Sequence, residues 1–423
     1  MRNPLAGSLA KNVGWMFLGR GLNFIVQAAY FILLARLLGA APYGTFVGAV
    51  AAVSLLSQYS ALGSGMILIR EVSRDKKRFQ QYWGNVIVTS ITVGLLCVTV
   101  FASFGKWMVG PASASIIVLV AIGECTCARI AEGAGQAFQA FEQLKLTAAL
   151  TSITNISRLG AATGMLVILH HSNVRQWAVA SLVVSCFSMA VSLIMVSTRL
   201  GQPKLDIALF KKHFFEGIGF SIAASSCSAY NDIDKAMLSR YGMLAAGGIY
   251  SMAYRVVDIG FAPIASVHLA AFPRFCQLGI GGARGSIALA RKMLNKTVVI
   301  SLVIAAAMYL AAPLIPYVLG KSFASSVSAL RWLCILPAFR NLHMTSGDVL
   351  TGAGYQKYRT ATQIIAALFN FGINLWLIPA YSWHGAAWSS LATDGLLAGL
   401  NLLILAWLLR NENRQHIANQ VIA

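Results

Sequence analysis

The sequence predicts an all-α integral membrane protein with about twelve transmembrane helices, arranged as two parallel six-helix lobes around a central cavity. Three observations predict this: the apolar composition, the spacing of long apolar stretches and a weak internal repeat. Hydrophobic residues make up 57% of the 423 residues and charged residues only 11%, whereas an average soluble domain is about a quarter charged. Such a chain could neither keep a globular surface hydrated nor stay disordered, so a soluble enzyme and a disordered protein are excluded.

Twelve stretches are long and apolar enough to cross a bilayer, for which a helix needs about 20 mostly apolar residues. The first follows Arg2 and Lys11 and contains Arg20. It lacks the clean apolar core and cleavage site of a signal peptide, so we interpret it as a retained membrane helix. The loops are short and leave no room for a separate soluble domain. The predicted spans are residues 14–38, 43–68, 84–105, 113–133, 146–169, 175–197, 217–239, 244–270, 297–319, 327–350, 361–380 and 384–409.

The basic residues give the predicted orientation. An even number of spans places both termini on the same side of the membrane. With both termini in the cytoplasm, most Lys and Arg residues outside the spans fall in cytoplasmic loops, as the positive-inside rule requires. The formal charge of +20 is therefore interpreted as a topology signal and an attraction to the anionic inner leaflet. Nucleic acid is not expected as a partner.

Two stretches, residues 36–44 and 240–247, resemble each other. Each has an arginine, a glycine two or three residues later and a second glycine five residues after that, which pairs Gly44 with Gly247. Because six predicted spans separate the two copies, both halves have the same orientation. This is an arrangement found in transporters that work by alternating access. The predicted lobes are residues 1–200 and 201–423.

Prolines inside predicted spans are either hinges for such a motion or tolerated kinks, because each removes a backbone hydrogen bond from its helix. These prolines are Pro263, Pro313, Pro316 and Pro337.

No pattern of a catalytic or metal site is found. The seven cysteines have no metal-binding spacing and no C-x-x-C pair, which favours small buried hydrophobic residues. The sequence has no phosphate-binding P-loop, no G-x-S-x-G elbow and no H-E-x-x-H zinc motif. We therefore expect no enzyme activity, no cofactor and no metal.

Four strings resemble motifs of the polysaccharide flippases in the multidrug/oligosaccharidyl-lipid/polysaccharide exporter superfamily, in particular of its O-antigen and exopolysaccharide (Wzx-like) branch. Residues 35–46 are similar to that family's R-x-L-G-x-x-x-[FY]-G-x-[FY] turn after the first helix. Residues 133–142 and 350–354 resemble its turns after helices 4 and 10. The most specific string is an N-x-x-x-N…I-P…G-A-A pattern at Asn370, Asn374, residues 378–379 and residues 385–387.

The resemblance implies a carrier rather than an enzyme. Such flippases move an undecaprenyl-pyrophosphate-linked oligosaccharide from the cytoplasmic to the outer leaflet of the bacterial inner (plasma) membrane. The sugars pass through the central cavity while the lipid tail stays in the bilayer, and an ion gradient drives the cycle. The resemblance also makes membrane lipid, a polysaccharide polymerase and a chain-length regulator candidate partners.

Charged and polar side chains inside the spans are candidate substrate contacts, because a charge at the bilayer centre costs roughly 3 kcal/mol on insertion scales. Arg20, Asn23 and Gln27 share one face of the first predicted helix. An arginine offers a planar fork of donors suited to phosphate oxygens, so Arg20 is either a pyrophosphate contact or a structural arginine. The candidate substrate contacts are Arg20, Asn23, Gln27, Arg129, Lys235 and Arg255.

Acidic residues inside the spans are candidates for coupling transport to protons or sodium. The alternative is that they only neutralise basic neighbours. Arg129 and Glu132 are three residues apart, as are Arg255 and Asp258, so each pair shares a helix face. The candidate coupling residues are Glu124, Asp232, Asp234 and Asp258.

Two other functions stay open. A drug or cation antiporter of the same superfamily is disfavoured, because such exporters often carry an acid in helix 1, where this chain has Arg20 and no Asp or Glu. A membrane polysaccharide polymerase is expected to carry a long outer loop with its catalytic groups, and no predicted outer loop is long enough.

Overall fold

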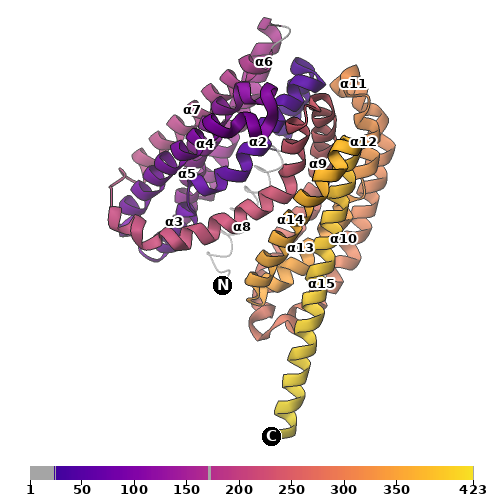
Figure 1. Ribbon diagram of the computed structural model, residues 1–423. Coiled ribbons are helices and arrows are strands. Elements are labelled where there is room, and N and C mark those ends of the chain that lie inside the picture. The colour runs from indigo at the N-terminus through magenta and orange to yellow at the C-terminus, as the bar shows by residue number, and fades with distance from the viewer. Residues whose placement is uncertain (1–22, 24, 170–172, 423) are drawn as a thin grey trace, which may run out of the picture. The chain divides into compact units, whose positions relative to one another are not determined.

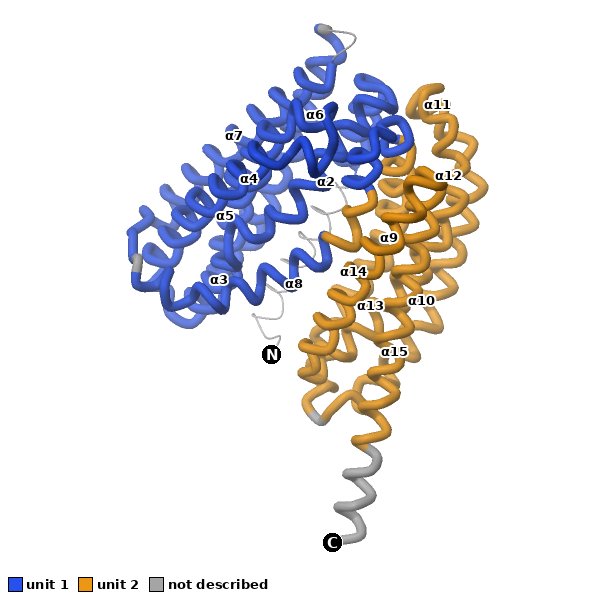
Figure 2. Tube along the Cα trace, in the orientation of Figure 1, with its two compact units in different colours: residues 1–228, 235–248 blue, residues 229–234, 249–423 orange. Residues whose placement is uncertain are grey.

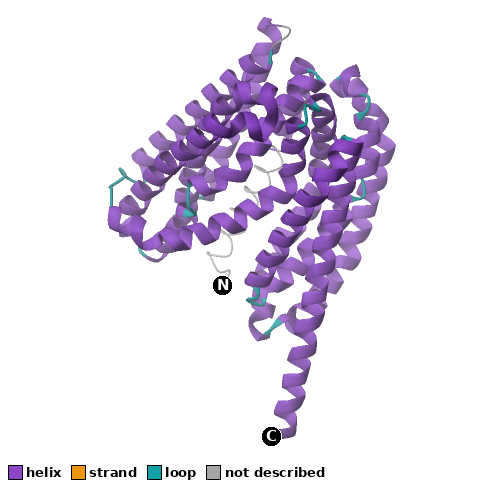
Figure 3. Cartoon of the chain, in the orientation of Figure 1, coloured by secondary structure: helices purple, strands orange, loops and turns teal. Residues whose placement is uncertain are grey.

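The computed structural model describes residue 23, residues 25–169 and residues 173–422. These residues are almost entirely helical and contain no strand (Figure 3), which confirms the predicted all-α class. Seven of their helices are long and apolar enough to cross a membrane. The described part of the first predicted span, Ile25–Leu38, is a shorter apolar helix.

Short connections join the helices of the chain (Figure 1). One connection is a five-residue π-helical turn, Gly123–Cys127. The predicted spans from residue 43 onward each coincide with one or two helices. The helices are α2 (Ala40–Ser60), α3 (Ser64–Arg74), α4 (Phe79–Ile122), α5 (Ala128–Ala140), α6 (Leu144–Leu169), α7 (Val174–Arg199), α8 (Ile207–Arg240), α9 (Leu244–Leu278), α10 (Ala283–Ala311), α11 (Ile315–Leu319), α12 (Ser326–Leu333), α13 (Leu336–Gly352), α14 (Gln356–Tyr381) and α15 (Trp383–Ile422).

The chain divides into two compact units (Figure 2). Unit 1 comprises residues 1–228 and 235–248, and unit 2 comprises residues 229–234 and 249–423. The helices α8 and α9 therefore contribute residues to both units. The predicted division into lobes after residue 200 falls in the loop between α7 and α8, and the two-lobe arrangement stays a prediction.

Two helices of unit 1 begin at capping side chains. The Asn173 carboxamide accepts a hydrogen bond of 2.9 Å from the Gln176 backbone N–H, and the Gln176 side chain accepts one of 3.0 Å from the Asn173 N–H. Asp206 Oδ1 accepts hydrogen bonds of 3.1 and 3.3 Å from the N–H groups of Ala208 and Leu209. These bonds satisfy N–H groups that lack partners within the helix, and they fix where α7 and α8 start.

Prolines mostly mark the beginnings of helices. Pro313, Pro316 and Pro337 stand in the first turns of the 3-10 turn Ala312–Leu314, of α11 and of α13. A proline there loses no helical hydrogen bond, so these three residues are not kinks within a helix. Among the four candidate hinges, only Pro263 lies inside a helix, α9.

The helix α4 contains the predicted span 84–105 and the first half of the next one, 113–133, and it bends at a glycine between them. Its backbone leaves helical geometry at Gly110, with φ 76° and ψ 170°. Glycine adopts a positive φ without steric cost, and Pro111 then starts the second helical segment with a fixed φ. A sharp bend thus replaces the loop expected between residues 105 and 113.

The first turns of α2 and α9 pack backbone against backbone within unit 1. A Cβ atom added to Gly44 would lie 1.9 Å from the Leu244 carbonyl oxygen, and one added to Gly248 would lie 2.0 Å from the Ala40 carbonyl oxygen. The two contacts are reciprocal, so Gly44 and Gly248 are the residues that let the two helices approach. Gly247, the second glycine of the predicted repeat, does not take part, because a Cβ atom there would lie 3.6 Å from Leu238 Cβ, an ordinary van der Waals distance.

Buried hydroxyl groups tie α2, α4 and α8 together beside this contact. Ser113 Oγ donates to the Thr45 carbonyl oxygen at 2.8 Å and lies 2.6 Å from Ser239 Oγ. Ser239 Oγ also donates to the Val109 carbonyl oxygen at 3.0 Å. Small residues and interhelical hydrogen bonds hold membrane helices together, because lipid tails are as apolar as leucine.

We predict that Gly248→Ala lowers the thermal unfolding midpoint of the purified protein, whereas Gly247→Ala does not. The methyl group on residue 248 must displace the backbone of α2, and overpacking of this kind costs about 1–3 kcal/mol. The control makes the same chemical change one residue away. Tryptophan fluorescence during heating in detergent measures both midpoints, and equal midpoints for the two variants would contradict the reciprocal contact.

An ion pair outside the apolar spans joins α3 to α8. Both Nη atoms of Arg70 bind the Glu216 carboxylate, with Nη2 3.1 Å from Oε2. His213 Nδ1 lies 3.1 Å from the same oxygen. The hydrogen bond from Arg70 lowers the pKa of Glu216 from 4.5 to about 2, against a smaller opposing effect of burial.

Because the pKa of Glu216 is lowered in the folded state, the ion pair stabilises the fold fully above about pH 4.5 and loses this effect as the pH falls toward 2. We predict that Glu216→Gln lowers the free energy of unfolding by about 0.5 kcal/mol at neutral pH, because the pair is partly exposed. The difference from the wild type should vanish toward pH 2. Denaturant unfolding across this range measures it, and Arg70→Gln should behave alike. A difference independent of pH would refute the assignment.

Candidate functional site

A polar pocket of about 420 Å³ lies among α5, α6 and α7 of unit 1. The spacing of its hydroxyl groups by three, four and seven residues places each set on one face of its helix. Ser188 Oγ is buried and makes no hydrogen bond within the described structure, so it is a polar group of the pocket wall that the described protein residues leave unsatisfied. These hydroxyl groups belong to Thr147, Thr151 and Thr154 of α6 and to Ser185, Ser188 and Ser192 of α7. We refer to this site as the unit-1 pocket.

An ion pair borders the unit-1 pocket. Arg158 of α6 lines it, and its Nη2 lies 3.4 Å from Glu124 Oε1. Both side chains are 28% exposed. Glu124 stands in the π-helical turn Gly123–Cys127, a rare conformation that is frequent at functional sites. The arginine is thus held in place yet accessible to an anionic ligand.

A second ion pair lies on α5. Arg129 Nη1 is 2.7 Å from Glu132 Oε2, which confirms that this pair shares a helix face. Arg129 also donates to Gln58 Oε1 and to Ser57 Oγ, both at 3.3 Å, and Gln58 donates to Ser228 Oγ at 3.2 Å. Arg129 and Gln58 line a smaller pocket of about 210 Å³, and Glu132 lines both pockets. The two pockets of unit 1 therefore share a charged wall.

The first three candidate substrate contacts come from the start of the chain. Arg20 lies outside the described residues. Asn23 donates to Ser152 Oγ and accepts from Asn155 Nδ2, both at 3.2 Å, and Asn155 lines the unit-1 pocket. Gln27 is half-buried on the helix Ile25–Leu38. The structure thus brings Asn23 next to a residue of the pocket, and its contact with substrate stays a prediction.

The other candidate substrate contacts differ in burial. Lys235 of α8 is buried in unit 1. Arg255 of α9 belongs to unit 2, and its Nη1 lies 3.9 Å from Asp258 Oδ2. This confirms that Arg255 and Asp258 share a helix face. Their roles toward substrate stay predictions, as does that of Arg129.

Two candidate coupling acids lie near the end of α8. Asp234 is fully buried and accepts hydrogen bonds from the Tyr250 hydroxyl and from Ser390 Oγ, the latter at 3.1 Å. Asp232 is half-buried. Asp234 is thus a hydrogen-bond acceptor that joins α8, α9 and α15 within unit 2.

Asp258 has a closer partner than the one expected from its own helix. Arg340 Nη1 of α13 lies 2.8 Å from Asp258 Oδ1, although 82 residues separate the two. Arg340 also pairs with Asp394, with Nε 3.5 Å from Oδ2. The sequence does not indicate these pairings, because neither Arg340 nor Asp394 has an opposite charge three or four residues away. Only the tertiary fold brings them together.

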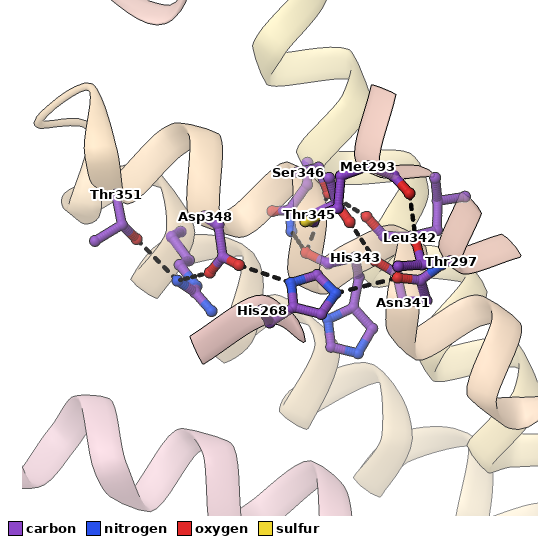
Figure 4. A network of polar contacts seen from close by, with 12 residues as sticks. His268, Met293, Thr297, Asn341, Leu342, His343, Thr345, Ser346, Asp348 and Thr351 are labelled. Carbon is purple, nitrogen blue, oxygen red and sulfur yellow. Dashed lines mark hydrogen bonds and ion pairs between the residues drawn. The ribbon is translucent and has the colours of Figure 1, made fainter. Parts of the chain in front are cut away.

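A second polar network of unit 2 joins α9, α13 and α14 (Figure 4). His268 Nδ1 is 2.8 Å from Asp348 Oδ2, and its Nε2 is 3.1 Å from Asn341 Oδ1. Arg359 Nη1 lies 3.5 Å from Asp348 Oδ1 and donates to Thr351 Oγ1 at 2.9 Å. Both oxygens of this buried carboxylate thus have partners.

The asparagines of the N-x-x-x-N string also pack inside unit 2. Asn370 Nδ2 donates to Thr393 Oγ1 at 2.8 Å, and Asn374 Nδ2 donates to Asn370 Oδ1 at 2.9 Å. Gly385 of α15 lets this helix approach α14 closely, since a Cβ atom added to Gly385 would lie 2.2 Å from the Leu377 carbonyl oxygen. This string therefore holds α14 against α15.

Solved structures of membrane transporters share this fold. An inward-facing multidrug resistance MATE family transporter of the MOP superfamily matches 93% of this chain and 96% of its own, with a TM-score of 0.73 and 14% identity. The lipid II flippase MurJ, in an inward closed conformation, matches 92% of this chain and 87% of its own, with a TM-score of 0.75 and 12% identity. Similarity at these identities establishes the fold of a multi-pass membrane protein.

Among curated proteins, no significant match to this sequence was found. The family model described as "Polysaccharide biosynthesis protein" matches residues 9–279, which is more than half of the 423 residues. This match agrees with the family resemblance of the four sequence strings. The chain therefore belongs to the polysaccharide biosynthesis protein family.

Proposed function

We propose that this protein is a flippase that moves a lipid-linked oligosaccharide from the cytoplasmic to the outer leaflet of the bacterial inner membrane, for assembly of a surface polysaccharide. Family membership supports a role in polysaccharide biosynthesis. The fold shared with the lipid II flippase MurJ supports transport of a lipid-linked sugar. Because a fold alone does not select a substrate, the chemistry of the unit-1 pocket must do so.

The unit-1 pocket is the observation that carries the proposal. Its walls are rich in Ser and Thr hydroxyl groups, which both donate and accept hydrogen bonds, as sugar hydroxyls do. Arg158 lines the pocket and Arg129 lines its neighbour, and arginine binds phosphate through paired donors. A cationic drug would instead favour aromatic walls. Hydroxyl groups and arginines together suit a sugar attached to a phosphate.

Each arginine of these pockets is already paired with a glutamate, Arg158 with Glu124 and Arg129 with Glu132. A phosphate that binds Arg158 would exchange with the Glu124 carboxylate. The released carboxylate then needs a new positive partner, such as a proton or a sodium ion. This exchange links substrate binding to ion binding, the role proposed for Glu124.

We also propose the lipid carrier, the orientation in the membrane, the partner proteins and the further site residues that the sequence suggests. The lipid carrier is undecaprenyl pyrophosphate, both termini are cytoplasmic, and a polysaccharide polymerase and a chain-length regulator act beside the protein. The cycle is ion-coupled alternating access. Further substrate contacts are Arg20, Asn23, Gln27, Lys235 and Arg255, and further coupling acids are Asp232, Asp234 and Asp258.

The proposal is tested in a strain that lacks this gene and keeps its polymerase. Lipid-linked repeat units are quantified in sealed vesicles of known sidedness with an impermeant sugar-oxidising probe. We expect single repeat units to accumulate on the cytoplasmic face and to reach the outer leaflet when the gene is restored. Normal arrival of units at the outer leaflet without the gene would refute the flippase and favour a drug or cation antiporter.

We predict that Thr151→Val combined with Ser188→Ala slows flipping in the same vesicles. Each change removes a hydroxyl from the unit-1 pocket with little change in shape, and one lost hydrogen bond lowers apparent affinity by about two- to tenfold. Thr163→Val is the matched control, because Thr163 lies on α6 and does not line this pocket. Equal slowing by the control, or normal flipping in the double variant, would show that the pocket does not hold the sugar.

A further inference from the structure

A buried cluster in unit 2 joins α9, α13 and α15 through charged side chains. Arg340 of α13 lies at its centre. Its Nη1 is 2.8 Å from Asp258 Oδ1, its Nη2 donates to the Tyr254 hydroxyl, and its Nε is 3.5 Å from Asp394 Oδ2. His343, one turn further along α13, places Nε2 3.7 Å from Asp394 Oδ1. We refer to Arg340, His343 and Asp394 as the Asp394 cluster.

The negative charge of Asp394 has few compensating contacts for a carboxylate that is so deeply buried. The residue is 4% exposed, and no described residue makes a hydrogen bond to Oδ2. The 3.7 Å between Oδ1 and the His343 ring is also longer than a hydrogen bond. A buried ionised carboxylate is stable only when it is both paired and hydrogen-bonded. Asp394 has a positive neighbour but lacks the hydrogen bond.

A second buried aspartate, Asp348 of α13, shows the contrast. Asp348 also stands between a histidine and an arginine, but its Oδ2 lies only 2.8 Å from His268 Nδ1 and its Oδ1 3.5 Å from Arg359. Figure 4 shows His268 joined to Asp348 and, through its other ring nitrogen, to Asn341. An aspartate, a histidine and an arginine therefore form a hydrogen-bonded cluster at Asp348, whereas the same three residue types form no such bond at Asp394 among the described residues.

The charges around Asp394 explain why its carboxylate lacks a hydrogen bond from Arg340. Arg340 offers both Nη atoms to α9, to Asp258 and Tyr254, and has only Nε left for Asp394. One guanidinium thus faces two carboxylates, and Arg255, the other cation near Asp258, is 39% exposed at 3.9 Å. Among the described residues, further titratable groups that act on Asp394 or His343 are Asp234 of α8, His268 of α9 and Arg359 of α14.

We propose that Asp394 and His343 form a proton-binding site. A proton from water adds to Asp394 Oδ1, and the new O–H donates to the lone pair of Nε2 on neutral His343. The ion pair between Asp394 and Arg340 is given up, and Arg340 stays with Asp258. The cluster gains one positive charge, and the link between α13 and α15 changes from an ion pair to a neutral hydrogen bond. The proposal rests on the proposed function, and it identifies a site where protons are coupled to transport.

Infrared difference spectra of the full-length protein in nanodiscs test proton binding directly. A protonated carboxyl has a C=O stretch that the carboxylate lacks. We expect the wild type to gain such a band as the pH is lowered and Asp394→Asn to lose it. Asp348→Asn is the matched control, because it neutralises the buried aspartate that His268 and Arg359 already satisfy. This variant should keep the band. Persistence of the whole band in Asp394→Asn would overturn the proposal.

Two further variants test the neighbours without removing the carboxyl. Arg340→Gln removes the positive charge, so the protonated band should persist to higher pH. His343→Ala removes the ring acceptor, so the band should shift in frequency and appear only at lower pH. Circular dichroism verifies that each variant is helical. Spectra of His343→Ala identical to those of the wild type would remove His343 from the site.

Transport measurements separate this proposal from the proposed function. In the vesicle assay, flipping by the wild type should respond to an imposed pH gradient, and flipping by Asp394→Asn should not. Infrared spectra as expected with no flipping by the wild type would refute the flippase and leave the proton site standing. A normal response to the gradient in Asp394→Asn would refute coupling through this site and leave the flippase standing.

Discussion

Inside a bilayer no water is available to a polar group, so each one must find its partner within the protein. The helices of this chain are organised around that requirement. Apolar side chains such as Phe104, Trp107 and Leu310 are widely exposed, whereas buried hydroxyl, amide and charged groups face one another between helices. Burial of apolar side chains gains no hydrophobic free energy in lipid, where helices associate through van der Waals packing and interhelical hydrogen bonds. The polar contacts and the close backbone approaches at glycines therefore contribute to the choice of which helices pack together.

The degree to which a carboxylate is satisfied differs within this molecule. Asp234 accepts two hydroxyl hydrogen bonds, and Asp348 is held by a histidine and an arginine. These two carboxylates join helices. Among the described residues, Glu124 has a single long ion pair and partial exposure, and Asp394 has a cation without a hydrogen bond. Partners held so weakly can be exchanged, which is why ion exchange and proton binding are proposed at these two residues.

The sequence predicted the features that depend on neighbouring residues. The apolar stretches located the helices, and the spacing of Arg129 and Glu132 predicted their ion pair, because three residues bring two side chains to one face of a helix. Contacts between distant segments could not be predicted in this way. Nothing in the sequence near Asp258 indicates Arg340, and only the reciprocal approach of two backbones identifies Gly248 rather than Gly247. The bend at Gly110 likewise could not be distinguished from a loop, because glycine followed by proline occurs in both.

The π-helical turn Gly123–Cys127 has a consequence for how this protein tolerates change in length. This turn lies inside continuous helix from α4 to α5. A π-helical turn holds one residue more than an α-helical turn, so its five residues rotate the chain about as far as four α-helical residues do. Removing one residue there would let regular α-helix run from α4 into α5 and would leave Arg129 facing Gln58 and Gly133, whose Cβ position lies 2.5 Å from Val86, at its contact. A deletion inside α5 itself would instead rotate every later residue of that helix by about 100°. The turn is therefore the place between α4 and α5 where the chain can lose one residue and still keep the charged wall shared by both pockets.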